Sequence, residues 1–206
     1  MKGPVERVYV VDDEPAVRKG LWRLLRSAGY EVSTFASAED FLQGLEPEAA
    51  GCAILDVAMP GLDGLALQRT LADRGAALPV LFLTGRGDVP ASVKAMKAGA
   101  TDFLTKPVDE DVLLEALRRA LERGKAERES RRRLVEARER LEALTPRERE
   151  VLEGVVAGRL NKQIAGDLGI AEKTVKVHRG RVMEKLGASS VAELVRLADR
   201  AKPRSS

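Results

Sequence analysis

Five polar side chains lie at the end of a short apolar run or directly after one, and their types suit the transfer of a phosphoryl group. They are Asp12, Asp13, Asp56, Thr84 and Lys106. A carboxylate can attack phosphorus as a nucleophile, while an ammonium and a hydroxyl can bind the transferred oxygens. Each residue alone has an ordinary explanation, because Asp and Thr at strand ends often cap turns. Their arrangement together predicts phosphoryl chemistry.

Three of these side chains are carboxylates, and neighbouring carboxylates do not all stay ionised without a compensating cation. Hard oxygen ligands beside a phosphate substrate favour Mg²⁺ over softer metals. The sequence therefore predicts Mg²⁺ as cofactor. The single cysteine, Cys52, lies in an apolar run and is expected to be a core residue in a reducing compartment.

The apolar runs that carry these residues alternate with stretches of helical spacing, such as the one containing Leu21, Leu24 and Leu25. The predicted strands are Arg7–Val11, Glu31–Phe35, Cys52–Leu55, Pro79–Leu83 and Thr101–Leu104. Five strands alternating with five helices predict an α/β doubly wound, five-stranded parallel sheet. Ligands of such sheets bind beyond the carboxyl ends of the strands, so the five polar residues are expected to converge there.

The charge of the chain divides it into two parts. Residues 1–124 hold 15 Lys and Arg against 19 Asp and Glu, whereas residues 125–206 hold 20 against 13. An acidic half followed by a basic half indicates two tasks, the second suited to a polyanionic partner, although a basic face is often only solvated. No apolar stretch approaches about 20 residues and the first residues lack a signal-peptide core, so we expect no membrane partner and a cytoplasmic location.

A charged helical stretch joins the two parts. We expect a long linker helix over about 109–143, either continuous or interrupted, in which residues 122–133 are almost free of apolar side chains. Four apolar residues then follow at heptad-like spacing, namely Leu134, Ala137, Leu141 and Leu144. Two interpretations stay open: a solvated helix without a partner, or a short seam between two copies of the chain.

The last part of the sequence predicts a small, all-α helix-turn-helix domain. Thr145-Pro146-Arg147-Glu148 is typical of a capped helix start, and a second helix is expected from Asn161 to Gly169. A third helix is expected over about 172–186, and a fourth from Ser190 with Glu193 as its capping partner. The third helix would pack inward through one apolar stripe and turn a basic face outward. That face suits the major groove of DNA, and the alternative is a basic helix that only contacts solvent.

Residues from about 5 to 122 resemble the receiver domains of response regulators, which have a flavodoxin-like fold. The resemblance rests on Val11-Asp12-Asp13-Glu14, on the run from Asp56 to Gly64, on Thr84-Gly85 and on Lys106-Pro107. It implies that Asp56 is the phosphorylation site and that Asp12, Asp13, Asp56 and the carbonyl of Ala58 hold Mg²⁺. It further implies that Thr84 and Lys106 contact the phosphoryl oxygens and that the Lys106–Pro107 peptide is cis.

The receiver resemblance also implies a switch. Phe103 occupies the place of an aromatic side chain that rotates inward when the Thr84 hydroxyl moves toward the phosphoryl group, and we prefer this role to the alternative of a plain core residue. Arg86, two residues beyond Thr84, could approach the phosphoryl group. The implied partner is a sensor histidine kinase.

The segment after the linker resembles the LuxR-type helix-turn-helix through Leu144 to Leu152, Asn161 to Ala165 and Lys173 to His178. Joined to a receiver, it resembles the NarL/FixJ class of transcriptional regulators, nearest to FixJ. This implies a homodimer on phosphorylation that binds promoter DNA and acts on RNA polymerase. The DNA-contacting candidates are Lys176 and Val177 for bases, with Lys173, Thr174, Arg179, Arg181 and Lys185 for phosphates. The predicted domains are residues 1–122, a linker at 123–143 and residues 144–206.

Two other functional classes compete with a DNA-binding switch. An aspartyl-phosphate hydrolase of the haloacid-dehalogenase type needs a second carboxylate two residues after the nucleophile, where this sequence has Ala58. We therefore expect no enzyme. A regulator that is controlled by a partner protein without phosphorylation would not need the complete acceptor set.

Two residues of the third helix of the second domain depart from the pattern of the LuxR-type family. Ala171 stands at its cap, and Gly180 lies in its middle, each costing about 1 kcal/mol of helix stability.

Overall fold

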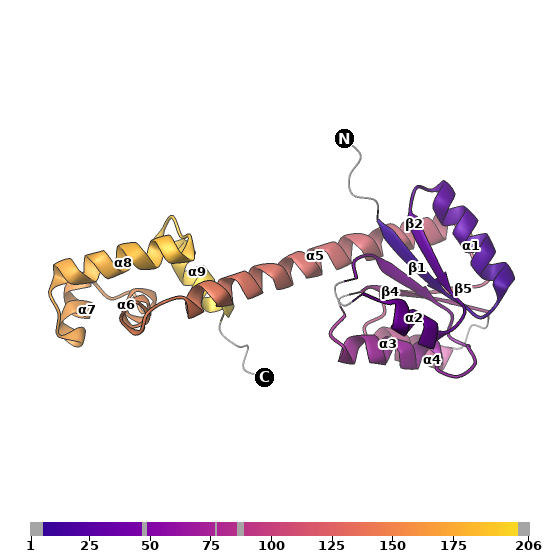
Figure 1. Ribbon diagram of the computed structural model, residues 1–206, viewed down its shortest axis with the longest axis horizontal. Coiled ribbons are helices and arrows are strands. Elements are labelled where there is room, and N and C mark those ends of the chain that lie inside the picture. Colours follow the sequence, from indigo (N-terminus) through magenta and orange to yellow (C-terminus); the bar gives the residue numbers. More distant parts are fainter. Residues whose placement is uncertain (1–5, 47–48, 77, 86–88, 202–206) are drawn as a thin grey trace. The chain divides into compact units, whose positions relative to one another are not determined.

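The computed structural model describes residues 6–46, 49–76, 78–85 and 89–201. The chain divides into two compact units, Met1–Arg128 and Glu129–Ser206. The first unit is an α/β domain and the second is helical (Figure 1). In the described ranges no helix is both long and apolar enough to cross a bilayer.

A parallel sheet forms the centre of the first unit. Its strands are β1 (Arg7–Val11), β2 (Glu31–Phe35), β3 (Cys52–Leu55), β4 (Val80–Thr84) and β5 (Asp102–Thr105). They lie in the order β2-β1-β3-β4-β5, and every neighbouring pair is parallel. The predicted fold class is confirmed. The last two strands each begin and end one residue later than predicted.

Helices cover both faces of this sheet. On one face lie α1 (Pro15–Ser27) and the first turns of α5 (Glu110–Glu142), and on the other lie α2 (Ala38–Gly44), α3 (Gly64–Asp73) and α4 (Val89–Lys97) (Figure 1). Strand β1 serves both cores, since Val8 and Val10 join one while Tyr9 and Val11 join the other. Its unbroken apolar sequence therefore reflects burial on two sides. Ser37 caps α2, because its hydroxyl accepts from Asp40 N at 3.1 Å.

Helix α5 is continuous over 33 residues, so the interruption considered from sequence is absent from it. Its first turns bury Leu113, Leu117 and Leu121 in the core of the first unit. Near its other end, Leu144 is buried in the core of the second unit and Leu141 packs against that core. These two positions of the heptad-like seam are thus neither solvated nor open to a partner. They belong to the packing of the helical unit.

Four further helices build the second unit: α6 (Pro146–Val156), α7 (Asn161–Leu168), α8 (Glu172–Leu186) and α9 (Val191–Ala201). The capping box of α6 is formed as predicted by Thr145 and Glu148, whereas Ala171 gives α8 no side-chain cap. At α9 the predicted box is only half formed. Ser190 accepts from Glu193 N, but the Glu193 carboxylate accepts from Ser189, one residue earlier than expected.

Candidate functional site

The strand order explains why the acidic residues meet. From β1 the chain crosses to β2 on one side, and β3 lies on the other side of β1, so the crevice between the ends of β1 and β3 is the switch point of the sheet. Val11 and Leu55 are register partners at these ends. Asp12 and Asp56 are the next residues of the two strands, and Asp56 N donates to Val11 O at 2.9 Å. Their side chains therefore leave the sheet at the same place.

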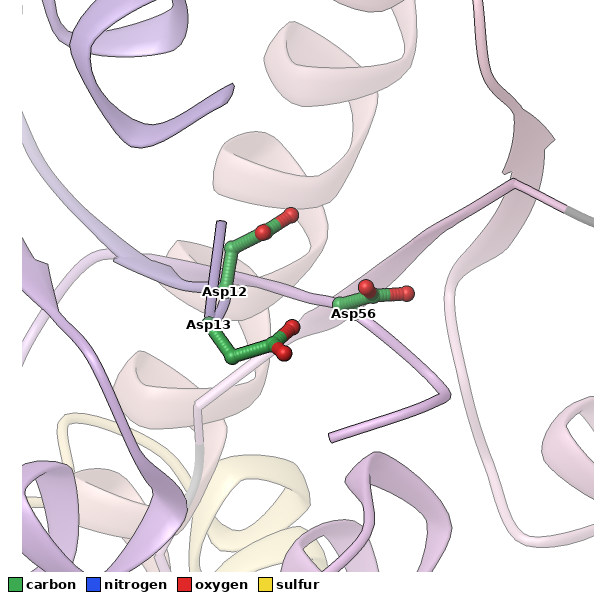
Figure 2. Close-up of side chains that lie close together, drawn as sticks. All are labelled: Asp12, Asp13 and Asp56. Atoms are coloured by element: carbon green, nitrogen blue, oxygen red, sulfur yellow. The ribbon is translucent and has the colours of Figure 1, made fainter. Parts of the chain in front are cut away.

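Three carboxylates gather at this crevice. One oxygen each from Asp12, Asp13 and Asp56 lies within 4.8 Å of the others (Figure 2). Asp12 and Asp56 are buried, with 2% and 6% of their surface exposed, whereas Asp13 lies nearer to solvent. Carboxylate oxygens at this spacing, two of them withdrawn from water, form a donor set that fits a hard divalent cation. Among the described residues this is the acidic group compact enough to do so.

Lys106 contacts two of these carboxylates. Its Nζ lies 2.7 Å from Asp12 Oδ2 and 3.2 Å from Asp56 Oδ2, and it reaches Glu14 Oε1 at 3.8 Å. The backbone fixes this position, because Lys106 N donates to Thr84 O at the ends of β4 and β5. The Lys106–Pro107 peptide is cis, as predicted.

Burial and charge act in opposite directions on this cluster. Burial raises the pKa of Asp12 above its ordinary value, and the hydrogen bond from Lys106 only partly offsets that effect. Burial also disfavours the ammonium of Lys106, but the hydrogen bonds and charges of Asp12 and Asp56 outweigh it and raise the pKa of Lys106. The lysine is therefore charged at neutral pH and supplies a fixed positive group beside Asp56.

The remaining predicted residues of the first unit lie around this cluster. Thr84 ends β4 and is buried. Phe103 is half-buried opposite Phe82 in the sheet register, and the ring centroids are 6.0 Å apart. Ala58 is exposed two residues after Asp56, and its N–H donates to Asp56 Oδ1 at 3.4 Å. Arg86 lies outside the described residues.

Three residues of this site were not found from sequence. Arg18 of α1 donates through Nη1 to the carbonyl of Asp12 at 2.6 Å, and Glu14 N donates to Asp12 Oδ1 at 2.9 Å. Glu39 of α2 accepts from the backbone N–H of Leu62, which holds the loop that follows Asp56. In the sequence Arg18 and Glu39 are ordinary charged helix residues. Only the fold brings them to the crevice.

All seven predicted DNA-contacting residues lie on α8, and six of them are exposed. The inward stripe of this helix is buried as expected through Val175, Val182 and Leu186. The exposed candidates are Lys173, Thr174, Lys176, Val177, Arg181 and Lys185. Gly180 lies among them, and open space surrounds the position that a Cβ would take. A basic helix face with one small gap is thus available to a polyanion.

Two of the predicted phosphate contacts are engaged inside the helical unit. Lys185 Nζ donates to Glu148 Oε2 at 2.7 Å and to the carbonyl of Ala143 at 3.1 Å. Arg179 Nη1 donates to Asn161 Oδ1 at 3.0 Å, which ties α8 to the first turn of α7. Helical periodicity places both side chains on a flank of α8, but it cannot show which neighbouring group accepts their hydrogen bonds.

Comparison with known proteins agrees with this geometry. Residues 8–118 match the response regulator receiver domain, and residues 142–198 match the bacterial regulatory proteins of the luxR family. The chain is similar to the response regulator protein TodT of Pseudomonas putida, at 47% identity over 95% of this chain and 86% of that protein. It is also similar to the transcriptional regulatory protein FixJ of Bradyrhizobium diazoefficiens, at 43% identity over 94% and 95% of the two chains.

A solved structure shares the fold at full length. The response regulator StyR superposes with a TM-score of 0.88 at 46% identity, covering 96% of this chain and 100% of that one. The two matched segments account for both units, and the order of motifs is the one expected from sequence. The chain therefore belongs to the two-component response regulators of the FixJ type, which join a receiver domain to a LuxR-type DNA-binding domain.

Proposed function

We propose that this response regulator is switched on by phosphorylation of Asp56 by a sensor histidine kinase and then binds promoter DNA as a homodimer. The observation that carries the proposal is the convergence of Asp12, Asp13, Asp56 and Lys106 at the switch point of the sheet. In the transfer, Asp56 Oδ forms a bond to phosphorus while the bond from phosphorus to the donor's histidine nitrogen breaks. That nitrogen leaves with its electron pair.

The residues of this chain have separate tasks in that step. Asp56 is the nucleophile, and Lys106 balances charge on the transferred oxygens from its fixed place beside it. Asp12, Asp13 and Asp56, with the carbonyl of Ala58, would hold Mg²⁺, which fits a donor set made only of oxygens. Bound there, Mg²⁺ supplies positive charge that neutralises the phosphoryl oxygens. Thr84 would donate its hydroxyl to the same oxygens.

Phe103 would then report the modification. Phe103 lies on β5 and packs beside Phe82 of the neighbouring strand β4, which ends in Thr84. When the Thr84 hydroxyl moves toward the phosphoryl group, the ring would turn inward and change the surface formed by α4, β5 and α5. In the unphosphorylated state the half-buried ring would keep its present packing against the core.

The output would be a change in gene transcription. The exposed basic face of α8, with Lys176 and Val177 toward bases and Lys173, Thr174 and Arg181 toward phosphates, would enter the major groove, and two copies would sit about one DNA turn apart. The bound dimer would then act on RNA polymerase. We propose residues 1–122 as the receiver, 123–143 as the linker and 144–206 as the DNA-binding domain.

A regulator rather than an enzyme is supported by the position after the nucleophile. A hydrolase that uses an aspartyl phosphate needs a second carboxylate two residues later, and the exposed methyl group of Ala58 cannot exchange protons with a substrate. Steady multiple turnover in a panel of phosphate esters would contradict this part of the proposal.

The test combines phosphorylation with DNA binding. Acetyl phosphate or a kinase should convert the parent chain to a retarded species on Phos-tag gels, and Asp56→Asn should abolish that species. Asp73→Asn, which changes an exposed carboxylate of α3, is the matched control and should be phosphorylated normally. Equal dimerisation and equal DNA binding by the treated parent and by Asp56→Asn would refute the switch. DNA binding that changes on addition of a partner protein, without phosphorylation, would favour a regulator that is controlled by protein contact alone.

A further inference from the structure

The end of the linker helix and the end of the DNA-facing helix hold each other. The last turn of α5 and the last turn of α8 both belong to the unit Glu129–Ser206. Arg140 of α5 donates through Nη1 to the carbonyl of Leu186, the last residue of α8, at 3.3 Å. In return, Lys185 of α8 donates to the carbonyl of Ala143, directly after α5, at 3.1 Å. Each helix thus supplies a cation to the other helix's terminal carbonyls.

This exchange solves an electrostatic problem. The last carbonyls of a helix have no partner inside it, and they carry a partial negative charge. Two C-terminal ends placed together would repel each other and leave carbonyls unpaired. Arg140 and Lys185 lie in the last turns of their helices, where positive charge is most stabilising, and each also pairs a carbonyl of the opposite helix.

A buried carboxylate locks the arrangement. Glu148 of α6 is only 2% exposed, and its Oε2 accepts from Lys185 Nζ at 2.7 Å and from Thr145 N at 2.9 Å. Thr145 is the cap of α6 and follows α5 after two residues. Below these polar contacts, Leu144 joins Leu186 in one apolar core. Polar and apolar contacts therefore fix the end of α5 to the end of α8.

We propose that Lys185 and Arg140 are positioning residues that make the end of the linker helix part of the DNA-binding element, so that α8 follows any movement of α5. The inference rests on the proposed function in that α8 is taken as the DNA-reading helix. It assigns Lys185 a task different from the phosphate contact expected from sequence. Phosphorylation would alter DNA affinity through this clamp, which we define as Arg140, Lys185 and Glu148.

Four variants of the full chain test the clamp. Lys185→Met and Arg140→Met each remove one cation, and Arg140→Met leaves the Lys185–Glu148 pair intact should loss of that pair prevent folding. Lys185→Arg keeps the charge and is the rescue variant. Arg138→Met is the matched control, because Arg138 is exposed two residues before Arg140 and its side chain makes no hydrogen bond or ion pair within the described ranges.

The first readout is hydrogen exchange in the unphosphorylated chain. The amides of Ala143 and Leu144, which donate to Glu139 and Leu141, close the end of α5. They should exchange roughly tenfold faster in Lys185→Met and Arg140→Met, as expected for loss of a charged hydrogen bond. Lys185→Arg and Arg138→Met should keep the parent's rate. Unchanged exchange in both Met variants would overturn the clamp.

The second readout is the ratio of DNA affinities with and without acetyl phosphate, measured on a labelled duplex that the parent selects from a random pool. The ratio should fall to about one in the two Met variants and stay at the parent's value in the other two. Equal losses of affinity in both states would leave the ratio unchanged and show that the contacts only stabilise the domain. If phosphorylation of the parent left its DNA affinity unchanged, the proposed function would be contradicted. The exchange rates would then still show whether the clamp holds the end of α5.

Discussion

The Nζ of Lys106 lies 2.7 Å from Asp12 Oδ2, although the two residues are 94 positions apart in the chain. Both are withdrawn from water, with 15% and 2% of their side chains exposed. Because the fold holds this pair next to Asp56, a positive charge already lies beside the proposed phosphorylation site. Charge placed in advance needs no rearrangement in the transition state.

Replacing Lys106 by Met should slow phosphorylation of Asp56 by roughly 100-fold, the usual cost of losing one charged donor in an active site. The rate is followed with acetyl phosphate on Phos-tag gels. Lys97→Met, which changes an exposed lysine of α4, serves as control and should leave the rate unchanged. A normal rate in Lys106→Met would remove the lysine from the proposed mechanism.

Replacing Gly180 by Ala should stabilise α8 and at the same time weaken DNA binding. A Cβ at this position meets no atom within 4 Å, so the variant gains the helix propensity of alanine, about 1 kcal/mol. The amides of Val182 and Leu186 should then exchange about fivefold more slowly. If the missing side chain lets the groove approach closely, DNA affinity falls despite this gain in stability.

Gly20→Ala is the control for that variant. Gly20 lies in α1 of the receiver with equally open surroundings, so its replacement should stabilise the receiver without altering DNA affinity. Unchanged or stronger DNA binding by Gly180→Ala would show that the groove does not come close to this position.

The sheet and the carboxylate cluster were predictable from the sequence because local signals and fold geometry agree there. Asp12, Asp56 and Lys106 each follow a β-rich apolar run, and parallel strands bring such residues to one edge. The capped start of α6 was equally readable, since Thr145 and Glu148 act on their own backbone.

What the sequence did not reveal depends on side-chain partners far away in the chain. Lys185 has the spacing of a residue at the edge of a DNA-binding face, but its ammonium donates hydrogen bonds to Glu148 and to the carbonyl of Ala143. Leu141 and Leu144 have the spacing of a dimer seam, but the core of their own domain covers them. Periodicity states which face a residue occupies, and packing decides what meets that face.

The stability of the helical unit should fall between about pH 4.5 and pH 2. The hydrogen bond from Lys185, followed by that from Thr145 N, lowers the pKa of Glu148 from 4.5 to about 2. The folded state therefore favours the carboxylate, and this stabilisation is complete above the unfolded pKa and is lost as pH falls through the folded one. Glu148→Gln should be less stable at neutral pH and lose stability less steeply in this range.

Chemical denaturation followed by exchange of α6 and α8 amides at a series of pH values measures this effect. Glu153→Gln, an exposed position of the same helix, is the control and should keep the parent's dependence on pH. An identical slope for Glu148→Gln and the parent would show that this carboxylate does not carry the acid sensitivity.

Replacing Gly124 by Ala should destabilise the receiver by about 1–3 kcal/mol, as overpacking usually does. Gly124 is an interior residue of α5, where alanine would normally be preferred by about 1 kcal/mol. A Cβ there would lie 2.5 Å from Cγ and 2.8 Å from Cδ of Pro79, and a proline ring cannot turn aside.

Urea unfolding followed by the fluorescence of Trp22, the single tryptophan, reports on the receiver alone. Gly20→Ala should shift the midpoint upward and Gly124→Ala downward. A midpoint at or above the parent's for Gly124→Ala would mean that α5 does not pack this closely against Pro79.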